Sequence, residues 1–459
     1  MYEWRDAWEK LSGAKLDIVE IPYAQHYQKV FTDLMTGTGQ YDAFFCGADW
    51  YGELIAGDYI ISIDDLMKDP RFPKWASDSL APSIKNLYTW GGKWYGTFND
   101  SDGQTLYYRK DILLNLDNQK KFKEKYGYDY NTPPKTWQEL YDVSEFYNGW
   151  DWNGDKEPDS GIVMHLKVGA QGMYHYVSLS APFCLLPGDK VDKYHNVYWF
   201  DPEDMTPLIN DEGHVKALEF QLKLQKTGPD AQVAWSLGEA WDYFLRAKAI
   251  YCFSWGDVGS LIQDESRSKI KGKMGNSILP GNNEVFDRSQ NTFIKMDPPN
   301  VWGNTTGGSW HGVISTLSKN KEAVYHLLAF HATKKISLWN ITRGWTGVNP
   351  GARFQFLPPE GDGKIEDYVS QGWNADDAKE YLKGEQENFF AKYIAPYLRI
   401  PGGNEYWVAL DRHLSEAYTG QVSAKEALDR TAKDWDETTN RIGREEQLKS
   451  YQSAIGYTK

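Results

Sequence analysis

The sequence predicts an α/β protein with two lobes, and three observations support this fold class. A strand–helix–strand pattern within roughly the first fifty residues is typical of a sheet whose strands are connected by helices. Further apolar strand patterns occur much later in the chain, after a long helical stretch. A chain of 459 residues is also too long for one ordinary hydrophobic core, so two units are expected.

The first elements lie in the first quarter of the chain. Trp4 and Leu11 belong to a helical pattern that ends at Gly13. Residues 16–21 alternate in polarity and end at Pro22, which is typical of a strand with one exposed face. The remaining patterns predict a helix over residues 26–36, a buried strand over 41–46, and a strand pair at 93–98 and 104–109.

From about residue 110 the pattern becomes helical and rich in Trp and Tyr. A loop is expected over residues 148–160 and a buried strand over 249–253. Residues 282–304 read as a second loop, because Pro298 and Pro299 interrupt them. The last predicted elements are a strand over 311–316, a helix over 321–333 and helices through 376–450.

Composition excludes several classes of function. A net charge of -14 argues against binding nucleic acid or an anionic membrane, which both require clustered Lys and Arg. No apolar run approaches the length of a membrane span. Cys46, Cys184 and Cys252 lie far apart, so neither a zinc site nor a disulfide framework is indicated. The N-terminus has no apolar segment of the kind found in secretory leaders, so no leader peptide is expected in this sequence.

The most informative feature of the composition is its aromatic content, with 20 Trp, 30 Tyr and 19 Phe in a polar chain. Aromatic side chains beyond those needed for packing offer rigid faces to flat, partly apolar ligands, of which sugar rings are an example. For any single Trp, burial in the core is the competing interpretation.

Seven short segments match, in order, the motifs of one protein family. They are Tyr41-Asp42, Ser62–Leu66, Gly92–Gly96 (GKWYG), Leu106–Asp111, Pro133–Leu140 (PPKTWQEL), Gly307-Gly308 with Ser318–Ala323, and the stretch from Ile400-Pro401 through Trp407 to Leu428. With these motifs the chain resembles the extracellular solute-binding proteins of carbohydrate ABC importers, family 1, the maltose-binding-protein-like group.

The resemblance implies the periplasmic-binding-protein-like type II fold, with two α/β lobes around a ligand cleft joined by about three crossovers. These are expected near residues 106–110, 278–280 and 335–345. The first lobe is then 1–108 plus 281–335, and the second 109–280 plus 336–459. The family opens with a strand upstream of the helix at Trp4, and this sequence lacks it, so a trimmed or misannotated start is expected. If the protein truly lacks that strand, the first lobe should be less stable and its ligand loop incomplete.

The function implied is capture of a sugar, glycoside or oligosaccharide in the interlobe cleft, followed by closure and delivery to the permease subunits of the importer. The resemblance implies a periplasmic or extracellular monomer, associated with the membrane through the importer. No cofactor is required and no nucleic acid is bound.

Four residues match ligand contacts of the family: Asp49, Asp102, Trp255 and Trp407. The acidic pair would bind hydroxyl groups and the indoles would stack on sugar rings. Taken alone, Asp49 reads equally as a helix cap and Trp407 as a core residue. Trp407→Ala is expected to weaken binding about tenfold with the fold intact. Neighbouring candidates are Tyr23, Trp50, Asp100, Tyr174, Asp257, Gly307, Gly308, Trp310, His311 and Trp345.

An acidic loop is a separate candidate, for structural calcium. Asp151, Asn153, Asp155, Glu157 and Asp159 have the spacing of oxygen ligands in the first part of a calcium loop. The loop departs from that pattern with Lys156 at the position of the usual Gly and Ile162 at that of the usual Glu. A solvated acidic turn is the alternative.

Catalysis is the main alternative function. With 64 carboxylates, a pair suited to glycoside hydrolysis could exist in the fold. The sequence contains none of the nucleophile-elbow, Walker A, His-Glu-x-x-His or dinucleotide motifs, and its nine His lack metal-ligand spacing. Binding without turnover is therefore preferred over a hydrolase or a lectin-like module.

Overall fold

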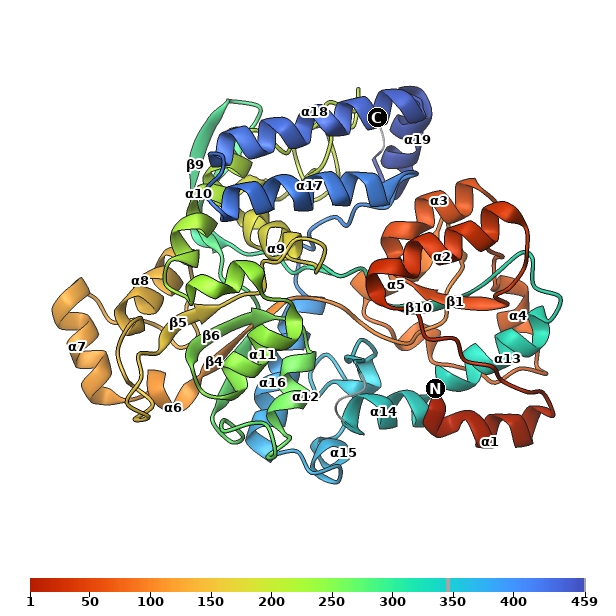
Figure 1. Ribbon diagram of the computed structural model, residues 1–459, viewed down its shortest axis with the longest axis horizontal. Coiled ribbons are helices and arrows are strands. Elements are labelled where there is room, and N and C mark those ends of the chain that lie inside the picture. Colours follow the sequence, from red (N-terminus) through yellow and green to blue (C-terminus); the bar gives the residue numbers. More distant parts are fainter. Residues whose placement is uncertain (344–346, 458–459) are drawn as a thin grey trace.

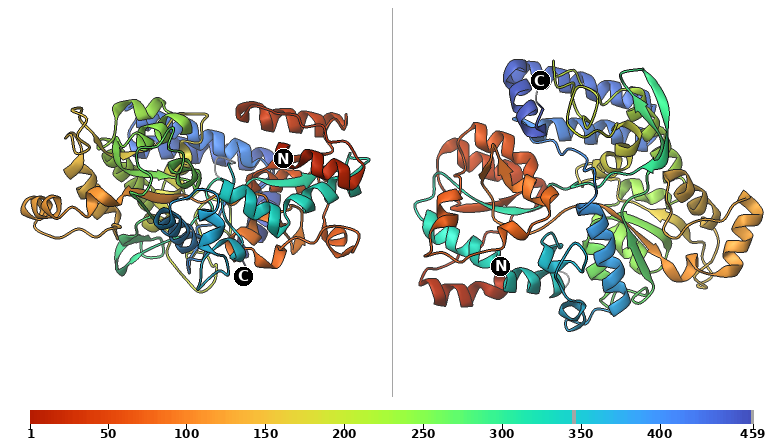
Figure 2. Two further views of the ribbon diagram at one scale, coloured as in Figure 1. Left: turned by 90° about the horizontal axis from the view of Figure 1, so that it is seen from below. Right: turned by 180° about the vertical axis from the view of Figure 1, so that it is seen from behind.

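The computed structural model describes residues 1–343 and 347–457, which form two α/β lobes side by side (Figures 1 and 2). The first lobe carries the N-terminal helices around β1 and β10, and the second carries a four-stranded sheet with helices on its faces. The two-lobed α/β class predicted from the sequence is confirmed. No helix in the described ranges is long and apolar enough to cross a membrane.

The sheet of the first lobe is small. Strand β1 pairs antiparallel with β10, so that Ala43 lies opposite Ile314 and Cys46 opposite His311. A second pair, β2 with β3, forms a short hairpin turned by Gly91. The elements of this lobe are α1 (Tyr2–Ser12), α2 (Tyr23–Thr36), β1 (Ala43–Cys46), α3 (Tyr51–Ala56), α4 (Asp64–Lys68), α5 (Pro82–Tyr88), β2 (Thr89–Trp90), β3 (Lys93–Trp94), β10 (His311–Ile314), α13 (Lys321–His331) and α14 (Lys334–Arg343).

The strand predicted over residues 16–21 is not formed. A cavity of about 630 Å³ separates this segment from β1 and is lined by apolar side chains that include Ile18, Phe44 and Leu328. Because the segment does not reach β1, the expected parallel pair is absent among the described residues, and β1 is paired on one edge only. The segment does alternate in polarity, but its apolar side chains line a cavity instead of joining a sheet.

The sheet of the second lobe has the strand order β5-β6-β4-β7, with β5 parallel to β6 and the other neighbours antiparallel. Strand β4 was expected to pair with residues 93–98, but it pairs with β6 and β7 instead. All its residues are buried, which suits a central strand better than an edge hairpin. These strands are β4 (Thr105–Arg109), β5 (Ser160–Val163), β6 (Ala249–Ser254) and β7 (Met274–Ser277).

Residues 282–300, expected as a loop of the first lobe, form the hairpin of β8 (Asn282–Asp287) and β9 (Thr292–Asn300). The hairpin packs on α9 and α10 of the second lobe, so this stretch and the crossover predicted near 278–280 were assigned wrongly. The chain instead crosses between the lobes at residues 99–104 and 301–310. It returns through α14, which contacts α13 of the first lobe and α15.

Helices cover both faces of the second sheet, and the helical tail predicted over 376–450 is confirmed. Helices α17 and α18 pack against each other at one end of this lobe. The helices are α6 (Lys110–Leu113), α7 (Leu116–Tyr126), α8 (Trp137–Tyr147), α9 (Met173–Cys184), α10 (Glu212–Gln225), α11 (Leu237–Leu245), α12 (Asp257–Ile262), α15 (Ile365–Val369), α16 (Ala375–Phe389), α17 (Gly403–Tyr418), α18 (Ala424–Ile442) and α19 (Arg444–Ile455).

Candidate functional site at the junction of the lobes

The two central crossover segments are held together by buried amide side chains. Asn304 accepts a hydrogen bond from the backbone N–H of Gln104 and donates one to its carbonyl, both at 2.8 Å. Asn388 on α16 brackets the backbone of Asn304 in the same way. This buried polar network fixes the relative position of the segments on which the candidate ligand residues lie.

Asp102 and Gly307 meet on these two segments. Gly307 has φ +112°, and a Cβ there would lie 2.7 Å from the Cβ of Asp102 and 2.8 Å from Nε1 of Trp255. Only glycine allows this approach. Asp102 is buried (8% exposed), and its backbone N–H donates to Oγ of Ser309 at 2.9 Å. Its Oδ2 has no hydrogen-bond partner within residues 1–343 and 347–457.

Asp49 approaches the same point from the first lobe. It lies in the 3₁₀ turn Ala48–Trp50 that follows β1. A Cβ on Gly47 would lie 2.5 Å from Oδ1 of Asp49 and 3.6 Å from the carbonyl oxygen of Gly307. Gly403, at the start of α17 in the second lobe, packs against the backbone of Asp49. The turn therefore touches both the crossover and the second lobe.

The second lobe contributes a cluster of aromatic rings. Tyr174 packs against Trp255 and Trp407, with ring centroids 5.9 and 5.1 Å away. Its hydroxyl lies 3.0 Å from that of Tyr397, whose ring is next to Gly308. Both indoles are almost fully buried, at 4% and 3% exposed, and Nε1 of Trp255 donates to the carbonyl of Thr306. Nε1 of Trp407 has no hydrogen-bond partner in the part of the chain that the structure describes.

The first lobe contributes a second aromatic group. The ring of Trp310 stacks on His26 at 5.6 Å and meets Tyr23 edge-on at 6.0 Å. Trp50 is 6.4 Å from Trp310 and is otherwise packed against Tyr27. Tyr23 is half exposed, so it is the member of this group that solvent reaches most easily.

Asp100 and Asp257 lie deeper in the junction, on either side of Asn349. Asp100 accepts hydrogen bonds from the backbone N–H groups of Ser101 and Asn349, both at 2.7 Å. The amide of Asn349 donates to Asp257 at 3.4 Å. Trp345, also a candidate, lies outside the described residues.

Burial shifts the titration of these groups. It raises the pKa of Asp49 to about 7. Burial, reinforced by repulsion between the carboxylates, raises the pKa of Asp100 and of Asp102 well above the usual range. Burial also lowers the pKa of His165, next to Trp255, and of His311 to about 3, so both are neutral, as expected for histidines in the core.

Sequence reasoning missed several residues that build this site. Tyr397 lies in an irregular segment between α16 and α17, and Ser309 and Asn304 lie in the crossover, where no periodic pattern marks them. Runs of buried polar residues in a segment without regular structure are the one available signal, since such groups need partners.

The acidic loop at residues 151–159 holds a side-chain cation. The ammonium of Lys248 lies 2.6 Å from Asp155, 3.0 Å from Glu157 and 3.4 Å from Asp159. Asp151 accepts hydrogen bonds from the backbone N–H groups of Gly154 and Lys156.

Asn153, the fifth candidate ligand, is also engaged within the loop, because its amide nitrogen donates a hydrogen bond to Asp159 at 2.8 Å. Within the described ranges no group of three or more His, Cys, Asp or Glu side chains is placed to hold a metal ion. The loop as placed therefore does not fit calcium, since Lys248 and backbone groups already engage the candidate oxygens.

Lys248→Met should lower the free energy of unfolding by about 2 kcal/mol, because Asp159 is fully buried and would lose its compensating charge. Denaturant unfolding measures the loss, with Lys190→Met at an exposed position as the control. A chelator should leave the unfolding of the wild type unchanged. A chelator-dependent loss of stability would restore the calcium interpretation.

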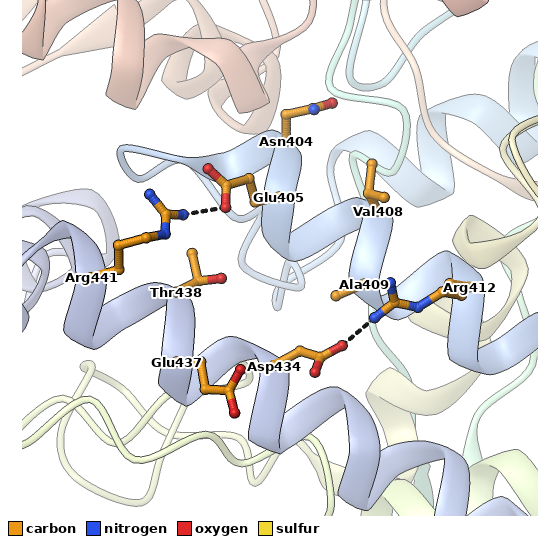
Figure 3. A pocket seen from close by; sticks show the side chains of 9 residues that line it. All are labelled: Asn404, Glu405, Val408, Ala409, Arg412, Asp434, Glu437, Thr438 and Arg441. Atoms are coloured by element: carbon orange, nitrogen blue, oxygen red, sulfur yellow. Dashed lines mark hydrogen bonds and ion pairs between the residues drawn. The ribbon is translucent and has the colours of Figure 1, made fainter.

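A groove between α17 and α18 lies apart from these residues (Figure 3). It has a volume of about 460 Å³, and ion pairs of Arg441 with Glu405 and of Arg412 with Asp434 cross it. None of the residues predicted for ligand binding lines it. The groove is therefore not the candidate site.

Two α/β lobes joined by crossovers, with acidic and aromatic side chains where they meet, form an architecture similar to that of the class of two-lobed binding proteins. The family model described as bacterial extracellular solute-binding protein matches residues 1–145. An ABC transporter solute-binding protein of Agrobacterium radiobacter, solved in complex with ribitol, has a TM-score of 0.69 at 18% identity, covering 95% of this chain and 94% of that one.

Relatives found by sequence agree with this class. A probable ABC transporter-binding protein of Deinococcus radiodurans is 23% identical over 328 residues, 71% of this chain and 66% of that relative. The galactooligosaccharide-binding protein of Bacillus subtilis is 23% identical over 438 residues, 93% of this chain and 83% of that relative. Two of the relatives extend well beyond the match, which spans 66% and 56% of their lengths. The resemblance to solute-binding proteins predicted from the sequence is confirmed.

Proposed function

We propose that this protein is the substrate-binding component of an ABC importer and that it captures a polyol, sugar, glycoside or oligosaccharide between its lobes. The observation that carries the proposal is the convergence of Asp49, Asp102 and Trp255 around Gly307, from three separate parts of the chain. Carboxylates for hydroxyl groups beside aromatic faces for carbon surfaces are the chemistry that such ligands require. Ribitol and galactooligosaccharide in the names of relatives support this ligand class.

Ligand bound by both lobes would favour the closed arrangement by its greater affinity for that state, and the permease subunits would recognise the closed form. We infer a monomer that works in the periplasm or outside the cell and meets the membrane through the importer. The extracellular family description supports this location.

Binding without turnover is preferred to hydrolysis. A hydrolase needs one carboxylic acid and one carboxylate on opposite sides of a bond, whereas Asp49 and Asp102 both lie near the same glycine, Gly307. A lectin-like module would bind at a shallow surface, whereas the candidate residues are mostly buried between two lobes.

A thermal-shift screen against polyols, monosaccharides and oligosaccharides tests the proposal, followed by small-angle X-ray scattering with the best ligand. Occupancy at a hundred times the Kd should stabilise the protein by about 2.7 kcal/mol. The radius of gyration should fall as the lobes close. Release of product from an oligosaccharide would favour the hydrolase, and indifference to the whole panel would contradict a sugar-binding function.

A further inference from the structure

We propose that the ligand carries a positively charged amine as well as hydroxyl groups, so that it belongs to the amino polyols or amino sugars. This inference rests on the proposed function and specifies the ligand of the same site. It comes from the charge balance of the junction, from an unpartnered carboxylate oxygen and from the aromatic faces beside it.

The protein supplies no positive charge to the junction acids. No lysine or arginine among the described residues forms an ion pair with Asp49, Asp100, Asp102 or Asp257, and burial without a counter-charge raises the pKa of all four. An ammonium group bound there would favour the ionised form of a neighbouring acid and would supply the counter-charge that the protein lacks.

Nearby groups that could carry positive charge are otherwise engaged. The guanidinium of Arg399 donates to the backbone carbonyls of Asn86 and Thr89 at 2.7 and 3.0 Å. His165 and His175 share a hydrogen bond of 3.0 Å in the core behind Trp255, where burial keeps both neutral.

Asp102 presents the acceptor for an amine. Its Oδ2 is buried without a hydrogen-bond partner among the described residues, and its side chain lies against Gly307, which Nε1 of Trp255 also approaches. A buried carboxylate oxygen left without a hydrogen bond is costly, and an ammonium group would supply both the hydrogen bond and the charge.

The surrounding rings suit the same ligand. Tyr174 packs edge-on between Trp255 and Trp407. A cation held at Asp102 would also be attracted by any of these rings whose centre lies within about 6 Å of it. Nε1 of Trp407 is a buried donor without a partner, so it calls for an acceptor such as a hydroxyl oxygen. Together these groups suit a molecule with both an ammonium and hydroxyls.

Calorimetric titration with matched pairs tests the inference at neutral pH. The pairs are glucitol with its 1-amino-1-deoxy analogue, glucose with glucosamine, and galactose with galactosamine, and the N-acetylated amino sugars serve as neutral analogues of similar shape. In at least one pair the amine should bind about tenfold more tightly than its neutral partner. N-acetylation should remove that advantage.

Variants locate the effect. Asp102→Asn should move the amine-to-neutral affinity ratio toward one, and Asp49→Asn provides a second test should the first variant fold poorly. Asp65→Asn, at an exposed carboxylate on α4, changes the net charge equally and should leave the ratio unchanged. Neutral partners that bind as tightly as the amines would overturn this inference while the proposed function stands. If no member of any pair binds and the wider panel also fails, both are overturned.

Discussion

Trp407→Ala should lower the free energy of unfolding by about 3–5 kcal/mol, the usual cost of removing a large aromatic side chain from a core. The indole is 3% exposed and packs against Trp199, Tyr174 and Tyr397, with centroid distances of 5.1, 5.1 and 5.4 Å. Sequence reasoning expected the fold to remain intact, because it placed this ring on an open ligand surface. The packing of this ring instead predicts that its removal destabilises the fold.

Val408 provides the matched control, because it follows Trp407 on α17 and is 55% exposed. Val408→Ala should change the stability by less than about 0.5 kcal/mol. Denaturant unfolding of the two variants measures both effects. Equal stability of Trp407→Ala and the wild type would mean that the ring is not packed in solution. The expected loss of ligand affinity is better measured with Trp407→Phe, which keeps an aromatic ring.

Glu385→Gln should stabilise the protein at pH above about 8 by about 2 kcal/mol or more. Glu385 on α16 is fully buried, and burial raises its pKa to about 8 although Tyr107 and Thr105 donate hydrogen bonds to it. Because the folded pKa lies above the unfolded one, the native state binds the proton more tightly. The stability contributed by protonation is therefore present at low pH and lost as pH rises toward 8.

Glutamine keeps the shape of the side chain without the charge, so the variant and the wild type should have similar stability near pH 5 and diverge at higher pH. Asp49, whose pKa is about 7, also titrates between these pH values, but it is common to both proteins and its contribution cancels in the difference. Glu437→Gln at an exposed position of α18 is the control. A difference that does not depend on pH would contradict a raised pKa for Glu385.

The two-lobed class could be predicted because it depends on strong local patterns. The apolar run at Ala249–Phe253 lies in the buried strand β6, and the helical spacing after residue 376 forms helices. The pattern at 16–21 misled because alternation shows that a segment has one apolar face, but not what that face meets. The hairpin at 282–300 was missed because its prolines occupy β9, a strand in which Asn300 alone is buried, and proline is tolerated in such strands.

The candidate site could likewise be predicted only in part from the sequence. The sequence could place Asp49 after a strand and Asp102 in a crossover, since both positions follow from local order and from the resemblance. It could not show that Trp255 and Trp407 share Tyr174 as a neighbour, because those three rings come from distant parts of the chain. It also could not show that Lys248, about ninety residues from the acidic loop, reaches the carboxylates there.

The amide bracket formed by Gln104, Asn304 and Asn388 has a mechanical consequence. The two crossover segments are hydrogen-bonded to one another and to α16, so neither segment can bend without the other. In the closing motion proposed above, the two segments would therefore have to bend together, about one axis that passes through these hydrogen bonds. Asp49 would then return to the same position near Gly307 each time the lobes close.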